Sequence, residues 1–549
     1  MSELHNQLSF ISPDPRIFQE KLNSLHTHFG DRTSELADRI RVLTIWPSAV
    51  RDAISAIDSK QEAESRGRLE RSQTPTTPVF KGRHVRYLSR GREYVEELLH
   101  VHSSSKPVRS PTPTRKLFSP RNSSDSFANV SENPTQQAFQ QAIRRLQHVE
   151  EFELNWYMDK GAEGEAWNFS LFPEIWQTIG PNLRKLTLDV QLFKMNDIVK
   201  YCYSLPKLEE LLLTIHGDTS PVNHKHLLSI DSSDTSVPYL INKLRPTLRH
   251  LSIKTIGHQQ LSLNFQLLES FPYLTSLSLN MPLDSEHLQD PSGFRRLLNA
   301  HPHITDLSIR YAKCCKDCTD DGFGLPSGKH MLYSDVSLPA LRSLEVGLHT
   351  PVPPFGSINP LYNTIARIGP DFTSLTFRDR NLKLDEIKSM LRLFPTYRLK
   401  KLSLFAKLLS PQLIDHIAHT CPALSSLSLE VETVVRSEST QASPAYQEDD
   451  VDGFSQALFN YAVDIENDRW RYVTWLLSDI SIMQWQFKVG HQHNWACMKA
   501  IARVIPSLRS FAGKGHMDVG ADAPVKPEAV QQRSRFIEMG LDEGLYHDG

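Results

Sequence analysis

The sequence is poor in cysteine and has no long apolar run, and each absence removes a class of protein. The 549 residues include six cysteines, too few and too unevenly placed for the disulfide framework of a secreted scaffold. No apolar stretch approaches the roughly 18–20 residues that cross a bilayer. The opening "MSELHNQLSF" lacks the basic and apolar regions of a secretory signal. We therefore expect a cytoplasmic or nuclear protein without membrane contact.

An excess of one charge is also missing. The formal net charge is −2, which gives no whole-chain attraction to nucleic acid or to an anionic membrane. A nucleic-acid partner is therefore not expected.

Motifs of catalysis and of metal binding are absent or incomplete. Neither G-x-S-x-G nor H-E-x-x-H occurs. "GLPSGKH", residues 324–330, is one residue short of the spacing between the glycines of a phosphate-binding loop, and its last residue is not a hydroxyl, so it indicates a turn. "AKCCKDC" places Cys315 and Cys318 in a C-x-x-C without a second such pair, whereas structural zinc needs four ligands. We predict free thiols there, with a zinc site or a redox disulfide as alternatives, and we predict no metal and no cofactor.

A phrase with apolar residues at positions one, four and six recurs along the chain. "CPALSSLSLEV" carries it at Leu424, Leu427 and Leu429. It returns in "PNLRKLTL", "PKLEELLL", "PTLRHLSI", "PYLTSLSL", "PHITDLSI", "PALRSLEV", "PDFTSLTF" and "YRLKKLSL", and more weakly in "RIRVLTI", "HVEEFEL" and "SIMQWQF". The copies are about 25 to 40 residues apart, the period of solenoid repeats.

The phrase predicts a strand whose apolar residues face one side, and the segments between copies predict helices. "SPQLIDHIAHTCP" is one such helix, with Ser410 as its N-cap and Pro411 in its first turn. Stacked copies bury a continuous apolar interior that one copy cannot bury alone. We therefore predict an α/β fold, an irregular solenoid with parallel strands on its concave face and helices on its convex face.

This array resembles the leucine-rich repeat superfamily in its irregular, ribonuclease-inhibitor-like form. The family's asparagine or cysteine at position nine is replaced, for example by Gln191, His216 and Arg380, which predicts variable loops. "LSFISPDPRIFQEKLNSLHTHFG" followed by "RIRVLTI" is similar to the order found in fungal F-box proteins with leucine-rich-like repeats. The resemblance covers residues 8–60 and 140–515. It implies recognition of a protein that is handed to a ubiquitin ligase.

The F-box itself, with its "LPxE"-like start, is not recognisable, so either this member has lost the motif or the gene model is truncated. A Skp-type adaptor is expected only if an unrecognised F-box-like surface exists.

We predict four regions along the chain. An N-terminal helical segment with the first repeat-like strands covers residues 1–101. A disordered Ser/Pro-rich insertion covers 102–135, the solenoid covers 136–515 with a polar insertion at 434–450, and a flexible tail covers 516–549, in which "RSRFIEMGLDEGLY" is a candidate docked helix. Serine–proline and threonine–proline pairs make Thr74, Thr77, Ser110, Thr112 and Ser119 candidate phosphorylation sites.

Candidate partner-binding residues lie on the predicted concave face. Small hydroxyl residues dominate position five, and position seven carries Lys254, Arg310 and Arg378 with Phe405 beside them. These residues are either simply solvated or form a stripe that recognises an acidic or phosphorylated partner. The aromatic segment 470–495 either caps the end of the array or binds a partner.

The sequence leaves three alternative functions open. The first is non-catalytic protein recognition, related to F-box ubiquitin-ligase subunits. The second is a scaffold or regulatory binder controlled by phosphorylation of the insertion. The third is an enzyme with a site built from loops, which has the least support.

Overall fold

The computed structural model describes fifteen stretches of the chain, and the structural statements below concern them. They are residues 6–26, 34–72, 134–157, 172–202, 205–217, 235–257, 261–283, 287–311, 336–347, 366–368, 372–394, 396–438, 449–464, 469–486 and 490–512. "AKCCKDC", "GLPSGKH", the five candidate phosphorylation sites and the tail from residue 513 lie outside them.

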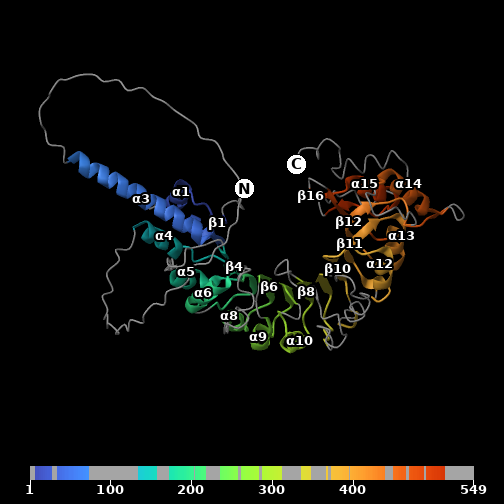
Figure 1. Cartoon of the computed structure of the whole chain (residues 1–549), viewed down its shortest axis with the longest axis horizontal. Coiled ribbons are helices and arrows are strands. Elements are labelled where there is room, and N and C mark those ends of the chain that lie inside the picture. The colour runs from blue at the N-terminus through green and yellow to red at the C-terminus, as the bar shows by residue number, and fades with distance from the viewer. Residues whose placement is uncertain are drawn as a thin grey trace, which may run out of the picture. The chain divides into compact units, whose positions relative to one another are not determined.

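The repeated phrases form consecutive strands of one open, mostly parallel sheet (Figure 1). Thirteen strands of the sheet pair side by side in the order β1 (Gln7–Phe10), β2 (Val42–Ile45), β3 (Glu151–Trp156), β4 (Lys185–Gln191), β5 (Glu210–His216), β6 (His250–Ile256), β7 (Ser276–Met281), β8 (Asp306–Tyr311), β9 (Ser343–Gly347), β10 (Ser374–Arg378), β11 (Lys401–Leu409), β12 (Ser426–Val434) and β15 (Asp479–Gln486). Strands β16 (Gly490–His493), antiparallel, and β17 (Ser510–Phe511), parallel, both pair with β15. The apolar residue at position four is in register from strand to strand, for example Leu186 with Leu211 and Leu402 with Leu427.

Helices connect the strands, and between β4 and β12 they line one face of the sheet (Figure 1). They are α1 (Pro15–His26), α2 (Ser34–Arg39), α3 (Pro47–Ser72), α4 (Pro134–Arg144), α5 (Phe172–Ile179), α6 (Met195–Tyr201), α8 (Ser236–Lys243), α9 (Leu261–Leu267), α10 (Ser292–Asn299), α12 (Leu384–Leu391), α13 (Pro411–Thr420), α14 (Val451–Ala462) and α15 (Trp495–Val504). Short 3-10 turns are η2 (Gly180–Asn182), η3 (Leu192–Lys194) and η5 (Thr396–Arg398). This is the α/β leucine-rich-repeat solenoid that the repeated phrase predicts.

The start of α13 confirms the predicted cap. The Ser410 side chain accepts a hydrogen bond from the Leu413 amide at 3.2 Å, and Pro411 occupies the first turn. A serine cap of this kind stabilises a helix by about 1 kcal/mol.

The core lies between the sheet and the helices. In β4, Leu186, Leu188 and Val190 are fully buried, while Lys185, Thr187 and Asp189 alternate with them on the other face. Each fully buried leucine stabilises the fold by roughly 1.5–3 kcal/mol. The residues between them form an outward face, defined here as the face of the sheet opposite the helices.

At the C-terminal end of the array, Tyr472 and Trp475 are buried, which agrees with a capping role for two of the six aromatic residues of segment 470–495. The short antiparallel pair β13 (Val463–Asp464) and β14 (Arg469–Trp470) precedes them.

Two compact units make up the chain. Residues 1–53 and 139–549 form the unit that contains the sheet, and residues 54–138 form the second. The second holds most of α3 and the start of α4, where the Thr135 hydroxyl donates to Oδ1 of Asp58 at 3.3 Å. Helix α4 begins at Pro134, so the last two residues of segment 102–135 are helical. Within the described stretches, no helix is long and apolar enough to cross a membrane.

Candidate interaction surface

A row of small hydroxyl residues runs along the outward face at position five of the repeats. Its members share half-buried side chains and adjacent register positions; they are Thr187, Ser252, Ser278, Ser308, Thr376, Ser403, Ser428 and Ser481. Leu212 and Glu345 interrupt the row. Short side chains keep this face low, so that another polypeptide can approach the sheet closely.

Position seven forms a second outward row. Lys254, Asn280 and Arg310 are neighbours in register on β6, β7 and β8, and Gly347 pairs with Arg378 on β9 and β10. The structure therefore brings the three predicted cations into one row, but Gly347 separates Arg310 from Arg378.

Phe405 does not continue this row beside Arg378. The Phe405 carbonyl accepts from the amide of Leu382 at 2.8 Å, so β11 is bonded at this level to the segment after β10. Asp379 explains the shift, because its φ of 67° turns the chain away directly after Arg378. Phe405 is half-buried and pairs with Glu430 on its other side.

Both arginines of the row have carboxylate partners. Arg310 donates from Nη2 and Nε to the two oxygens of Asp379, at 2.6 and 3.2 Å. The Arg378 Nε lies 2.7 Å from Oε1 of Glu345, an ion pair without the alignment of a hydrogen bond. The hydrogen bond to Asp379 raises the pKa of Arg310, against the opposing effect of burial. The section of the outward face around β8–β10 therefore carries little net charge.

Lys254 differs from the two arginines. Its side chain is exposed, and no carboxylate of the described residues pairs with it. A role of Lys254, Arg310, Arg378 and Phe405 in binding a partner remains a prediction.

Gly347 makes the Arg310–Asp379 pair possible. A Cβ at this position would lie 2.4 Å from Oδ2 of Asp379 and 3.1 Å from Cα of Arg310. We expect Gly347→Ala to displace the carboxylate and to remove most of the pair's contribution, about 1 kcal/mol for a partly exposed ion pair.

A double-mutant cycle checks this expectation. The coupling between Arg310→Ala and Asp379→Asn, measured by urea unfolding, should fall from about 1 kcal/mol to near zero when residue 347 is alanine. Asparagine is the matched replacement because it tolerates the left-handed backbone of position 379. Equal coupling in both backgrounds would contradict the role of Gly347.

A second cluster lies at the carboxyl ends of β3–β5. His216 Nε2 lies 2.6 Å from Oδ1 of Asp189, and the Tyr157 ring stacks on the His216 ring with centroids 4.6 Å apart. Tyr157, Gln191 and His216 occupy position nine of three consecutive repeats, and Gln191 pairs with His216. The Gln191 Oε1 is buried without a partner among the described residues. Sequence reasoning missed this cluster; the only signal was the replacement of asparagine or cysteine at position nine by Gln191 and His216.

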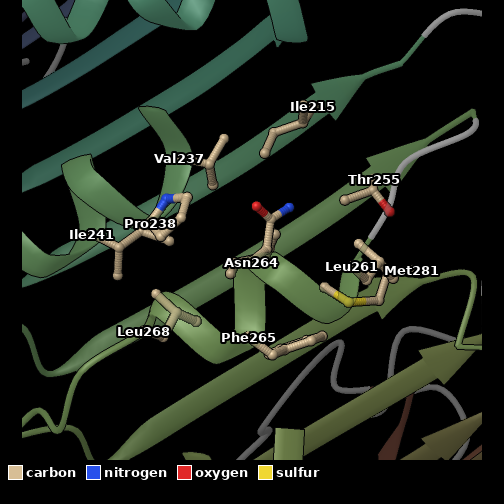
Figure 2. A pocket seen from close by; sticks show the side chains of 11 residues that line it. Ile215, Val237, Pro238, Ile241, Thr255, Leu261, Asn264, Phe265, Leu268 and Met281 are labelled. Atoms are coloured by element: carbon tan, nitrogen blue, oxygen red, sulfur yellow. The ribbon is translucent and has the colours of Figure 1, made fainter. Parts of the chain in front are cut away.

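A narrow cavity lies between α8, α9 and strands β5–β7 (Figure 2). Its volume is about 20 Å³ and its lining is almost entirely apolar, including Ile241, Phe265 and Met281. The Thr255 hydroxyl, also in the lining, has no partner among the described residues. This space suits about one water molecule rather than an organic ligand.

Within the described stretches, no group of three or more histidine, cysteine or carboxylate side chains is placed to hold a metal ion.

Comparisons with known proteins give weak likenesses. No protein-family model matches the chain, and no curated protein matches it in sequence. The solved structures that resemble it include the leucine-rich repeat-containing protein LegL7 from Legionella pneumophila, at 13% identity over 61% of this chain and 96% of that chain, with a TM-score of 0.34. TLR13 in its complex with ssRNA13 is 12% identical over 67% of this chain and 47% of that chain, with a TM-score of 0.30. Rad7 in its complex with Elc1 in yeast is 15% identical over 56% and 77%, with a TM-score of 0.32.

At these scores the likenesses carry no weight for function. The description as a leucine-rich-repeat solenoid rests on the strand register and helix placement of this chain.

Proposed function

We propose that this chain is a non-catalytic recognition protein that binds a protein partner on its outward face. The observation that carries the proposal is the row of small hydroxyl side chains, which continues in register from β6 to β12 with Glu345 as its one interruption. These side chains offer hydrogen-bond donors and acceptors at low height, and the ion pairs of Arg310 and Arg378 lower the cost of bringing a neutral polar surface onto β8–β10.

The partner is proposed to be a protein that is presented to a ubiquitin ligase, in the cytoplasm or nucleus of a fungal cell. This part rests on the order of the N-terminal strand, helix and first repeat, which resembles F-box proteins. A Skp-type adaptor would then contact an F-box-like surface that the sequence does not reveal.

Proximity labelling with the full chain tests both the binding of a partner by the outward face and the link to a ubiquitin ligase. Ser278→Arg with Ser308→Arg places two long cations on the hydroxyl row, and we expect labelling of the specific partner to fall to background. Asn196→Arg with Ala300→Arg is the matched control, because it adds the same charge at exposed positions near the helices. An unchanged set of labelled neighbours in the outward-face variant would overturn recognition by this face. Recovery of a Skp-type adaptor and a cullin separates a ligase subunit from a plain binder.

A scaffold regulated by phosphorylation is the second candidate. Ser110, Thr112 and Ser119 precede prolines among Arg109, Lys116 and other basic residues, and each phosphate would add about −1.5 to −2 charges there. We expect alanine at the three sites to change the set of labelled neighbours only if this switch operates. The same set in the alanine variant and the wild type would remove the second candidate.

A further inference from the structure

The segment between β14 and β15 presents two aliphatic side chains to solvent from an ordered turn. Tyr472 and Trp475 are 1% and 3% exposed, whereas Val473 and Leu476 are 58% and 62% exposed. Residues 471–474 are in a turn, and the Trp475 amide donates to the Tyr472 carbonyl at 3.2 Å across it. One pair is therefore buried in the core, and the other is exposed to solvent.

The inward pair fixes the turn. The Tyr472 hydroxyl bonds to Oδ1 of Asp415 at 3.1 Å, and Nε1 of Trp475 donates to the carbonyl of Cys421 at 3.1 Å. Both anchors lie on or directly after α13, which the Ser410 cap and the buried Leu413, Ile414 and Ile417 hold in place. The exposure of Val473 and Leu476 is therefore a built feature of the surface and does not arise from a loose loop. These two residues are called the apolar pair below.

The segment before the last described strand contacts the backbone on both sides of Leu476. Ser507 Oγ lies 2.7 Å from the carbonyl oxygens of both Trp475 and Leu477, the residues on either side of Leu476. Ser507 leads into β17, which pairs with the first residues of β15. The chain therefore passes beside the backbone of Leu476 shortly before it leaves the sheet.

The described part of the chain ends beside the first residues of β15. The Ala512 amide still donates to the Ile480 carbonyl at 2.9 Å, but the φ of Ala512 is 53°. Continuation along β15 is blocked, because β16 is paired with the same strand from Met483 onward. The described chain therefore ends beside Ile480, four residues after Leu476.

The remaining segment, residues 513–549, contains a matching apolar stripe. In "SRFIEMGLDEGLY", residues 534–546, Ile537, Leu541 and Leu545 are four residues apart, the spacing of one face of a helix. A short tether raises the effective concentration of such a segment to the millimolar range, which favours even a small apolar contact. We propose that residues 534–546 dock on the apolar pair Val473 and Leu476 of the same chain. This inference does not depend on the proposed function.

Hydrogen exchange of the full chain, followed by mass spectrometry, tests the docking. The amides of residues 534–546 should exchange about threefold or more slowly than in a free peptide of the same sequence. Val473→Asp with Leu476→Asp should restore the peptide-like rate. Phe193→Asp with Tyr397→Asp is the matched control, since these side chains are 69% and 62% exposed elsewhere on the surface, and it should leave the slow exchange in place.

Three results would overturn the docking. They are peptide-like exchange in the wild type, slow exchange that persists in the Val473/Leu476 variant, and slowing that grows with protein concentration, which would show a second copy in the site. If the aspartates at positions 473 and 476 disturb β15, the reciprocal variant Ile537→Asp with Leu541→Asp tests the docking instead. Hydroxyl-radical oxidation of Leu476 should rise in that variant, and an unchanged oxidation would count against the docking.

Discussion

Gly293→Ala is expected to lower the free energy of unfolding by about 3 kcal/mol, as overpacking against a rigid neighbour does. Gly293 lies in the first turn of α10, against α9. A Cβ there would lie 2.7 Å from the amide nitrogen of Gln266 and 2.8 Å from the carbonyl carbon of Phe265. Both atoms belong to the backbone and cannot rotate aside, so the two helices must separate.

Separation of the helices also loosens the core beneath them. Phe265 and Phe294 form an edge-to-face pair with centroids 5.1 Å apart, and both rings are buried. Such pairs contribute about 0.5–1.5 kcal/mol beyond their buried area. The urea midpoint of the full chain, followed by far-UV circular dichroism, measures the combined loss.

Gly453→Ala is the matched control for this prediction. Its Cβ would lie 2.1 Å from Oδ2 of Asp450, but that carboxylate is the end of a side chain and can rotate. Loss of the Asp450 cap costs about 1 kcal/mol, and alanine in place of glycine in a helix returns about the same amount. Equal urea midpoints for the Gly293 and Gly453 variants would show that α9 and α10 tolerate the added methyl group.

Alkaline pH should destabilise the protein through its buried thiols. Burial raises the pKa of Cys421 and of Cys497 to about 12, and that of Cys202 to about 11. An unfolded thiol ionises near pH 9 and the folded thiol does not, so the unfolded state binds fewer protons above that pH. The stability is therefore complete below about pH 9 and is lost as the pH rises toward 11–12, by up to about 1.4 kcal/mol per pH unit for each thiol.

Cys421→Ala isolates one thiol. At neutral pH the variant differs from the wild type in free energy of unfolding because it lacks a small buried side chain. This difference is the reference for the measurements at higher pH. Between pH 9 and pH 10.5 its free energy of unfolding should fall by about 2 kcal/mol less than that of the wild type. The difference between the two proteins cancels every other titrating group. The hydrogen bond from Trp475 is kept in the variant, because it is accepted by the backbone carbonyl of residue 421.

Urea unfolding at half-unit steps of pH measures the two curves. Parallel curves across this range would contradict a shielded Cys421 thiol. Alkylation by iodoacetamide gives an independent reading, because the native wild type should leave Cys202, Cys421 and Cys497 unmodified at pH 8. Rapid native modification of Cys421 would contradict its burial.

Local patterns in the amino-acid sequence determined most of the architecture. Period-two apolar residues, as in Leu186 and Leu188, set which side of each strand is buried, since successive strand residues point to opposite faces. The cap at Ser410 was equally readable, because it depends on a few neighbouring residues. These features need no information about distant parts of the chain.

Only the tertiary structure decided the electrostatics of the candidate surface. Arg310 on β8 and Asp379 directly after β10 are 69 residues apart in the chain, with β9 between them in the sheet. Their pairing depends on the missing side chain of Gly347 and the left-handed backbone of Asp379. A sequence pattern places residues on a face, but it does not say where a chain leaves its strand or which carboxylate then reaches a cation. The same reason hid the Tyr157–His216 stack and the need for glycine at position 293, because each depends on the distance between elements that are far apart along the chain.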